Sequence, residues 1–571
     1  QGALLLFLGV HARPSKPSCE EDRVWEVPGF GREAFPFKLY SGVLEVPGPV
    51  CGYDSLRVNY QFETSQGRPA RDPLVVWQQG GPGASSVVGA YSEMGFFRLG
   101  VSADGTPAPF RNPWAWNRLA NMLYMDGPAG SGYEASLSQC IREGVPVACA
   151  WNDTSQAEAF AHALRAFYRK FPDEADKDLY ITGESYFGQY GTNIARYILG
   201  TEPFSSSFNL KGIGLGNACH GGNETFVMCP GFNVDKNTVE FYWRQDFISP
   251  KFYREIQAAC SFPPSWVGKE VTADEECTMM LNKMNEIVAH NNILFLRDTC
   301  DMAPPESIVT NVLAGESPWR LDRLPPKRPK SLAQVKPGEM RKGPDGQPPY
   351  VVGGYPYACL DQAVISRWLV SPKVRKALHL EDLDPGSSSF SYELSGPAAI
   401  TLYPELMKKI QVLIYNGDSD SLAIYPADQE WIEHFEAESI LKEDVPWTAW
   451  HTNVLTTPAG FRTRYAVLGS DQHFTFMTVK GSGHMVPQIT PEAGLGVLAA
   501  VLGVDLPTPQ AAEAMYRRRE RRRGNPFRGQ ALSEDSDGVA HLQLQPPVAA
   551  WEEEQEEGGE AGGHGGQRSE L

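Results

Sequence analysis

Short apolar runs, each closed by turn-forming residues, recur along most of the chain and predict the strands of a sheet. Residues 43–46 and 56–62 predict an early pair of strands, with a Pro-Gly-Pro turn between them. Residues 74–77 form a continuous apolar run, as expected of a strand buried on both faces of a mostly parallel sheet, and 122–126 repeat the pattern. Further short strands are predicted at 179–182, 212–216, 412–415 and 474–479.

Helical periodicity appears between these strands. Residues 154–171 predict an amphipathic helix packed on the sheet, capped by Asp153 or Thr154 and ended by Pro172. Its apolar face is formed by Phe160, Leu164, Phe167 and Phe171. Further helical patterns lie at 193–199 and 362–378.

The chain divides into a globular part and less regular segments. Residues 19–506 are expected to form one globular domain, interrupted by a helical cap inserted at about 219–350. Within the cap, residues 315–349 are rich in Pro, Lys and Arg without an apolar period, which predicts an exposed, protease-sensitive loop. Residues 507–571, which include the basic run at 517–523, are expected to form a disordered charged tail.

Several features indicate the secretory pathway. The apolar run at 3–10 resembles the core of a signal peptide, and since the chain begins with Gln1, residues 1–18 are expected to be a truncated signal peptide. This run is too short to span a bilayer and no other stretch qualifies, so no membrane span is expected in the mature chain. Asn152 and Asn223 begin glycosylation sequons, and the ten cysteines fit an oxidising compartment.

Local disulfides are expected between Cys140 and Cys149 and between Cys219 and Cys229, while the remaining connectivity is open. The protein is therefore expected to be secreted or to reach a vacuolar or lysosomal lumen. The final Arg-Ser-Glu-Leu at 568–571 departs at two of four positions from the Lys-Asp-Glu-Leu retrieval signal, which makes retention in the endoplasmic reticulum the weaker alternative.

The net charge argues against a nucleic-acid partner, and the glycine-rich loop does not fit phosphate binding. The net charge is −18, whereas binding of nucleic-acid phosphates relies on clustered Lys and Arg. The glycine-rich run at 80–83 lacks the Lys-Ser/Thr that follows a phosphate-binding loop. It can instead present backbone N–H groups to a developing oxyanion, because glycine lets the backbone approach closely. No cofactor or metal is indicated, and the oligomeric state is left open.

A nucleophile elbow is predicted where the strand at 179–182 ends. Gly183 permits a sharp turn, and Ser185 lies at its apex before a helical pattern begins. A serine nucleophile needs a base to take its proton and an acid to orient that base. Asp418 and Asp420 follow one later strand and His484 follows the next, in the order Ser, Asp, His that this architecture requires.

These motifs together resemble those of the serine carboxypeptidase family. They are Trp77-Gln78-Gln79-Gly80-Gly81-Pro82-Gly83-Ala84-Ser85-Ser86, Gly183-Glu184-Ser185-Tyr186, Asn416-Gly417-Asp418-Ser419-Asp420 and Gly483-His484-Met485-Val486-Pro487. The resemblance runs from about Pro36 to Leu506. It implies an α/β-hydrolase fold with an inserted cap and an enzyme that removes C-terminal residues from peptides or proteins.

The resemblance also implies roles for single residues. Ser185, Asp420 and His484 take the positions of the catalytic triad, since the family's acid is the second aspartate of its turn. The N–H groups of Gly81 and Tyr186 match the oxyanion hole.

A further set is implied to bind the free carboxylate of the substrate: Gln79, Glu93 and Glu184. Two adjacent carboxyls repel each other, so the pair is expected to keep a proton above its ordinary pKa. A protonated pair can donate to a carboxylate that a doubly ionised pair would repel. Acid-favoured peptidase activity is therefore expected.

Four residues depart from the family pattern. Gln79 replaces an asparagine, Ala84 replaces a cysteine of a long-range disulfide, and Gln189 replaces a histidine. Phe187 replaces an alanine where helix and strand pack closely, and overpacking there costs ~1–3 kcal/mol unless the neighbours are small.

Two other functions are compatible with these motifs. The same triad can transfer acyl groups to an alcohol, in which case Gln79 would reflect a relaxed need to bind a carboxylate. Alternatively, the fold can serve as a non-catalytic binding or protective protein, although the three triad residues weigh against that reading.

Overall fold

A thirteen-stranded mixed sheet forms the centre of the molecule. The computed structural model describes residues 19–32, 35–101, 107–132, 137–221, 234–262, 275–289, 291–297, 362–383, 390–452 and 457–506. In sheet order the main strands are β1 (Arg23–Val24), β2 (Leu39–Val50), β3 (Tyr53–Glu63), β7 (Asn121–Met125), β4 (Leu74–Gln78), β11 (Leu179–Glu184), β12 (Leu210–Gly216), β14 (Gln411–Gly417), β17 (His473–Val479), β16 (Gly460–Val467) and β15 (Leu441–Trp450). The six strands from β7 to β17 are parallel, and antiparallel strands flank them on either side.

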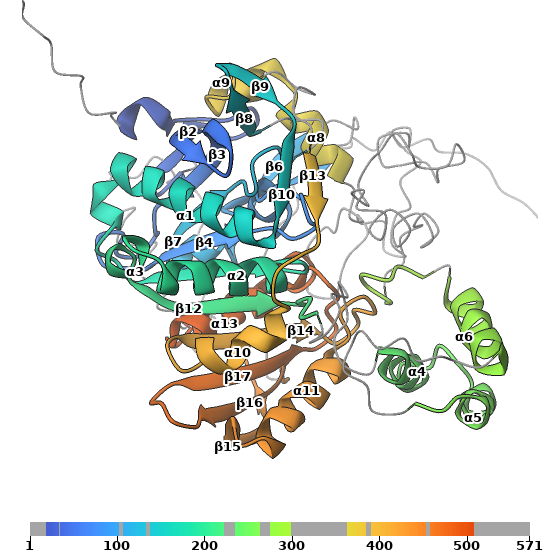
Figure 1. The fold of residues 1–571 in the computed structure, drawn as a ribbon. Helices are drawn as coiled ribbons and strands as arrows, with labels where there is room; N and C mark the ends of the chain where they lie inside the picture. The colour runs from blue at the N-terminus through green and yellow to red at the C-terminus, as the bar shows by residue number, and fades with distance from the viewer. Residues whose placement is uncertain are drawn as a thin grey trace, which may run out of the picture. The chain divides into compact units, whose positions relative to one another are not determined.

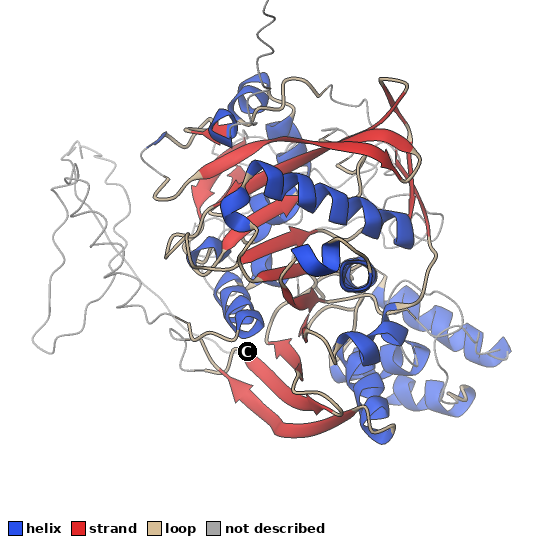
Figure 2. Cartoon of the chain, turned by 60° about the vertical axis from the view of Figure 1, so that its left-hand side comes forward, coloured by secondary structure: helices blue, strands red, loops and turns tan. Residues whose placement is uncertain are grey.

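The parallel strands are continuously apolar because helices cover both faces of the sheet (Figure 1; Figure 2). Leu74 and Val76 of β4 pack into one hydrophobic cluster, whereas Val75 and Trp77 pack into the other. The first cluster includes α1 (Asp153–Lys170), α2 (Phe187–Gly200), α3 (Phe204–Ser207), α10 (Ala399–Leu406) and α11 (Tyr425–Ala437). The second includes the π-helical turn η3 (Gly89–Glu93), α8 (Gln362–Leu369), α9 (Pro372–Ala377) and α13 (Pro491–Leu502), which follows α12 (Val486–Ile489).

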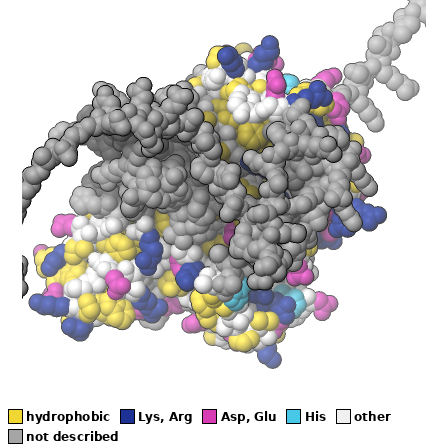
Figure 3. All heavy atoms as spheres, turned by 180° about the vertical axis from the view of Figure 1, so that it is seen from behind, with side chains coloured by type: hydrophobic (Ala, Val, Ile, Leu, Met, Phe, Trp, Pro, Cys, Tyr) yellow, Lys and Arg dark blue, Asp and Glu magenta, His cyan; other side chains and the backbone are white. Residues whose placement is uncertain are grey.

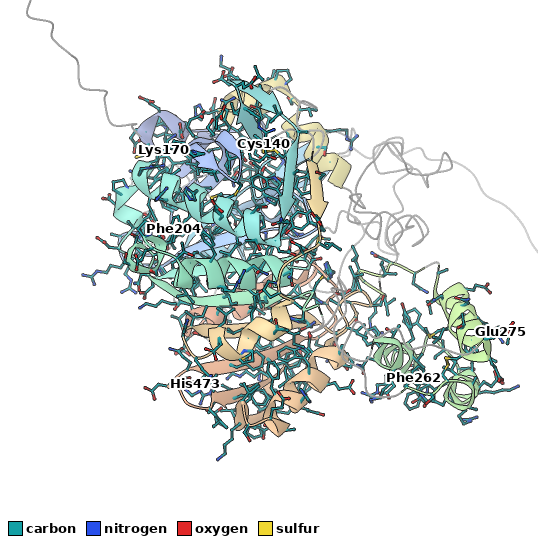
Figure 4. The ribbon with its side chains drawn as sticks, in the orientation of Figure 1. Cys140, Lys170, Phe204, Phe262, Glu275 and His473 are labelled. Atoms are coloured by element: carbon teal, nitrogen blue, oxygen red, sulfur yellow. A yellow bond between two sulfur atoms is a disulfide. The ribbon has the colours of Figure 1, made fainter. Side chains whose placement is uncertain are left out.

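The other described strands extend the main sheet or form two separate two-stranded sheets. The remaining strands are β5 (Phe97–Val101) and β6 (Pro107–Arg111), which form an antiparallel hairpin; β8 (Gln139–Arg142) and β9 (Val145–Val147), which extend from β3; and β10 (Cys149–Asn152) and β13 (Phe390–Glu393), which pair in parallel. The expected disulfide between Cys140 and Cys149 is confirmed (Figure 4). Cys219 is also disulfide-bonded, and Cys229 lies outside the described residues.

Among the described residues, three helices lie in the range predicted for the cap, about 219–350. They are α4 (Val234–Arg244), α5 (Pro250–Ala259) and α6 (Glu275–Val288). A disulfide joins Cys260, which follows α5, to Cys277 of α6, and an apolar cluster links the three helices to Ile424 and Ala427. The loop predicted at 315–349 and the tail at 507–571 lie outside the described residues.

All the predicted strands are present, but one turn and two helix predictions were wrong. The turn predicted at 47–49 lies within β2, which continues to Val50, and the chain turns at Cys51-Gly52 instead. Asn152, rather than Asp153 or Thr154, caps α1, because its side chain accepts hydrogen bonds from the backbone N–H groups of Thr154 and Ser155. The helix predicted at 362–378 is two helices, since α8 ends at Leu369 and α9 begins at Pro372, whose ring cannot continue a preceding helix.

The described surface carries mixed charges, and the described helices are not of the membrane-spanning kind. Lys and Arg side chains are interspersed with Asp and Glu on the described part of the face drawn in Figure 3. Among the described helices, none combines the length and hydropathy needed to cross a bilayer.

Candidate active site

Ser185 lies in a strained turn between β11 and α2. Its φ of +63° falls in the left-handed region, which a residue with a side chain adopts only when the surroundings hold it there. Three backbone hydrogen bonds do so: Ser185 N–H donates to Gly216 (2.9 Å), and the N–H groups of Gly188 (3.0 Å) and Cys219 (2.9 Å) donate to the Ser185 carbonyl. This strand–turn–helix geometry is that of a nucleophile elbow.

Asp420 and His484 form a buried hydrogen-bonded pair. Nδ1 of His484 lies 2.7 Å from Oδ2 of Asp420, with the two residues 5% and 0% exposed. The same oxygen accepts from the side chain of Asn217 (2.8 Å), and the other carboxylate oxygen accepts from Leu422 N–H (2.9 Å). Asp418 instead accepts from Gly481 N–H (2.8 Å), so the second aspartate of the turn is the one that contacts the histidine.

The sheet brings this pair to the same edge as Ser185. β11, β12, β14 and β17 are successive parallel neighbours, and the loops after them carry Ser185, Asn217, Asp420 and His484 in turn. Among the described residues, the Ser185 hydroxyl and Nε2 of His484 have no hydrogen-bond partner, including each other. In substrate-free sites of this kind the nucleophile–base hydrogen bond is often long and tightens when substrate binds.

The glycine-rich loop after β4 lies directly against the elbow. A Cβ added to Gly80 would approach the Tyr186 backbone nitrogen and the Glu184 carbonyl oxygen to 2.6 Å each, so a side chain there would collide with the elbow backbone. The N–H of Gly81 donates to no described residue in this structure. Gly81 and Tyr186 are thus both on backbone that lines the serine, as expected of an oxyanion hole.

Two further contacts hold this backbone in place. Ser85 Oγ and Ser86 N–H donate to Asp126 (2.7 and 2.9 Å), which anchors the glycine-rich loop to the end of β7. The Tyr186 hydroxyl donates to Asp153 at the start of α1 (2.8 Å). Asp126, Asp153 and Asn217 were missed as site residues from the sequence, because their roles arise from contacts between elements distant along the chain.

Gln79, Glu93 and Glu184 meet beside the elbow. Nε2 of Gln79 donates to Glu184 at 2.5 Å and reaches Glu93 at 3.4 Å, while Trp77 Nε1 donates to the Gln79 carbonyl oxygen (2.8 Å) and fixes the amide orientation. The two carboxyls are 0% and 1% exposed, and each has one oxygen without a partner among the described side chains.

Burial raises the pKa of both glutamates, because the charged form is poorly solvated there. The pKa of Glu93 is raised to about 7, whereas that of Glu184 is raised well above its ordinary value by burial and then by the charge of Glu93. The amide of Gln79 lowers the pKa of both carboxyls, but burial outweighs it. The pair therefore holds a proton at a pH above the ordinary glutamate pKa.

Two departures from the family pattern have local explanations. Phe187 is fully buried, and a Cβ added to Gly183 or Gly191 would lie 2.3 or 2.7 Å from its ring, so these glycines provide the room that the ring needs. Gln189 links α2 to the start of α10, since its amide donates to the Pro397 carbonyl (2.8 Å) and accepts from Ala399 N–H (2.9 Å).

One of the two predicted glycosylation sites lies among the described residues. Asn152 lies half-buried at the start of α1, and Asn223 is outside the described residues. In the part of the chain that the structure describes, no three His, Cys, Asp or Glu side chains are arranged to bind a metal ion.

A parallel sheet with an elbow serine, a His–Asp pair on later loops and a glycine-rich loop against the serine is the arrangement of an α/β hydrolase. The sequence profile of the serine carboxypeptidase family matches residues 28–503, and the chain belongs to that family.

The chain aligns with nearly the whole length of the curated relatives that it matches. The chain is 29% identical to the lysosomal protective protein of Mus musculus, over 87% of this chain and 97% of that protein. It is 26% identical to serine carboxypeptidase-like 21 of Arabidopsis thaliana, over 84% and 94%. Among solved structures, KEX1(delta)p, a prohormone-processing carboxypeptidase from Saccharomyces cerevisiae, shares the fold with a TM-score of 0.53 and 19% identity, over 85% of this chain and 96% of that one.

Proposed function

We propose that the protein is a serine-type carboxypeptidase that removes C-terminal residues from peptides and works best at acidic pH. The observation that carries this proposal is the buried Glu93–Glu184 pair, held by Gln79 next to the elbow serine. A site that only cleaved esters would have no need of two protonated carboxyls at this position. Family membership supports the same reaction class.

In the proposed reaction, Ser185 Oγ attacks the carbonyl carbon of the last peptide bond while Nε2 of His484 takes its proton. Asp420, bonded to Nδ1, fixes the ring orientation and stabilises the imidazolium. The oxyanion of the tetrahedral intermediate accepts hydrogen bonds from the N–H groups of Gly81 and Tyr186. His484 then protonates the departing amino group, and a water molecule, deprotonated by the same histidine, hydrolyses the acyl-enzyme.

The substrate's free carboxylate binds to Gln79, Glu93 and Glu184. With a proton on the pair, its carboxyl O–H can donate a hydrogen bond to the carboxylate. As the pH rises through the pKa of about 7 of Glu93, the pair gains a negative charge that repels the substrate carboxylate, and the remaining donor is lost when the second carboxyl ionises. Hydrolysis of peptides with a free C-terminal carboxylate should therefore fall toward neutral pH. Substrates without that carboxylate should not show this fall, because they do not contact the ionising pair through it.

The test compares a blocked dipeptide with its C-terminal amide between pH 4 and pH 8, using the wild type and Ser185→Ala. We expect release of the free C-terminal amino acid, lost in Ser185→Ala, and a peptide-to-amide ratio of kcat/KM that falls as the pH rises. Identical pH profiles would reject the role of the glutamate pair. Acyl transfer to an added alcohol without release of the amino acid would support an acyltransferase, and failure of Ser185 to react with an organophosphonate would support a non-catalytic protein.

We also propose that the protein works in an oxidising lumen of the secretory pathway, such as a lysosome or vacuole. The disulfides Cys140–Cys149 and Cys260–Cys277 fit that environment, as does the name of the mouse relative. Asn152 and Asn223 are the proposed glycosylation sites.

A further inference from the structure

A short segment that follows the cap helix α6 lies between the loops of the acid and the base. We name residues 291–297 the strap. Leu294, Phe295 and Leu296 at its centre are 3%, 4% and 5% exposed, so it is built into the domain rather than lying on its surface.

The strap is bonded to the residues on both sides of Asp420. Leu296 N–H donates to the Ser419 carbonyl (2.9 Å). The backbone N–H and the hydroxyl of Ser421 both donate to the Ile293 carbonyl, each at 2.9 Å. The backbone of the acid turn is therefore held immediately before and immediately after the aspartate.

The same strap is bonded to the base itself. The backbone N–H of His484 donates to the Leu294 carbonyl (2.6 Å). A Cβ added to the preceding residue, Gly483, would lie 2.2 Å from that carbonyl oxygen and 2.7 Å from Phe295 Cβ, so only glycine permits this approach. The two turns also contact each other directly, through the Ser419 N–H to Ser482 carbonyl bond (2.8 Å) and through the Asp420–His484 pair itself.

The strap has its own internal support. The Asn292 side chain accepts from Leu294 N–H (3.0 Å), and the Asn292 carbonyl accepts from Phe295 N–H (3.0 Å), which closes a tight turn. At the other end, the guanidinium of Arg297 donates to Gln245 of the cap (2.8 Å), whose amide donates to the Asp418 carbonyl (2.9 Å).

We propose that the strap is a positioning element for catalysis: it sets the spacing between the acid and base loops, with Asn292 and Gly483 as its positioning residues. The inference rests on the triad proposed above. Asp420 and His484 come from loops on two strands, and their 2.7 Å hydrogen bond requires both loops to hold their places. A third segment bonded to both loops supplies that constraint, because a shift of about 1 Å at a catalytic group can cost roughly 100-fold in rate.

The test uses Gly483→Ala, which pushes the strap off the base turn, and Asn292→Ala, which removes the acceptor that closes the strap's turn. Asn292→Asp keeps the acceptor oxygen, so its kcat should be close to that of the wild type and well above that of Asn292→Ala. Gly200→Ala is the matched control, since a Cβ there meets nothing within 4 Å and the residue lies at the far end of α2. Each variant is assayed as the full chain on a blocked dipeptide amide, which bypasses the carboxylate site.

We expect kcat to fall roughly 10- to 100-fold in Gly483→Ala and Asn292→Ala with little change in KM, and to stay at the wild-type value in Gly200→Ala. In an Asp420→Asn background the strap variants should cause no further loss, because the pair that they position is already disabled. Wild-type kcat in Asn292→Ala, or an undiminished loss in the Asp420→Asn background, would overturn the inference. Asn292→Ala and Asn292→Asp decide it if Gly483→Ala does not fold. A wild type that hydrolyses nothing would reject the proposed function and the inference together, whereas an active wild type with unaffected strap variants rejects the inference alone.

Discussion

Phe187 occupies a space that exists only because two neighbours lack side chains. Its ring lies over Gly183 of the elbow strand and Gly191 one turn further along α2, and the residue is fully buried. Replacing it with the alanine typical of the family would therefore leave a cavity in this chain. We expect Phe187→Ala to lower the free energy of unfolding by about 3–5 kcal/mol in urea denaturation.

Phe461→Ala provides the comparison for this prediction. Phe461 lies on β16 and is 38% exposed, so its truncation should cost clearly less. If Phe187→Ala cost no more than Phe461→Ala, the ring would not be filling the space between helix and strand.

The glutamate pair can be tested without altering its shape. In Glu93→Gln/Glu184→Gln both carboxyls become amides, which donate hydrogen bonds to a carboxylate but cannot ionise. For the wild type we expect the peptide-to-amide ratio of kcat/KM to fall about tenfold between pH 5 and pH 8, because the pKa of Glu93 is raised to about 7. For the double variant the ratio should be independent of pH, and a persisting fall would place the titrating group elsewhere.

Among single residues, those that belong to sequence motifs could be predicted, whereas those that reach the site only through tertiary contacts could not. Ser185, Asp420 and His484 each follow a predicted strand, so their loops could be assigned to one edge of the sheet. Asn217 and Asp153 contact the site only after folding, and Asp153 was taken as a helix cap because an aspartate at a helix start usually is one. Its carboxylate instead turns inward, where it accepts from the hydroxyls of Tyr186 and Tyr392.

Among the elements, α1 links a proposed glycosylation site to the support of the oxyanion hole. Asn152 is both the sequon asparagine and the N-cap, and the next residue, Asp153, holds Tyr186. Asn152→Ala removes the sequon and the cap together, whereas Thr154→Ala removes only the sequon, because Thr154 contributes its backbone N–H to the cap. We expect both variants to lose the glycan mass, and only Asn152→Ala to lose about 1 kcal/mol of stability relative to Thr154→Ala.

Intact mass and urea denaturation of secreted protein measure both effects. Equal stability of the two variants would show that the cap is dispensable for α1. An unchanged mass in both would show that the sequon is not occupied.

Elements were predictable where burial was complete. The strands from β7 to β17 have helices on both faces and read as apolar runs. β15 and β16 were missed, because they lie at the edge of the sheet, where exposed charged residues such as Glu443 and Arg462 interrupt the pattern. The break between α8 and α9 was visible in the sequence as Pro372, but the apolar period continues across it.

For the molecule as a whole, buried carboxyls dominate the expected response to pH. Glu63, Glu93, Asp126 and Glu184 are each at most 2% exposed. Burial raises the pKa of Glu63 to about 8, of Glu93 to about 7 and of Asp126 to about 6, and it raises that of Glu184 well above the ordinary value. Glu63 takes no part in the proposed reaction. Its carboxylate accepts a hydrogen bond from the N–H of Phe96, which follows the turn that carries Glu93.

The direction of the effect follows from proton binding. A pKa that is higher in the folded than in the unfolded chain means that the folded chain binds the proton more tightly. The stabilisation is complete below the ordinary glutamate pKa of 4.5 and is lost as the pH rises through the folded-state values, up to about 8 for Glu63. Each such proton changes the free energy of unfolding by about 1.4 kcal/mol per pH unit within that window.

We therefore expect the free energy of unfolding to be greater at pH 5 than at pH 8, with urea denaturation at each pH as the measurement. Glu63→Gln should flatten this dependence, because an amide of the same shape has no proton to lose. Glu286→Gln is the control, since Glu286 is exposed on α6 and should leave the slope unchanged. Stability that stayed level or rose from pH 5 to pH 8 would mean that these carboxyls are already ionised in the folded chain, and the hydrogen-bond donor assigned to the Glu93–Glu184 pair would then be absent at the pH where the enzyme is proposed to work.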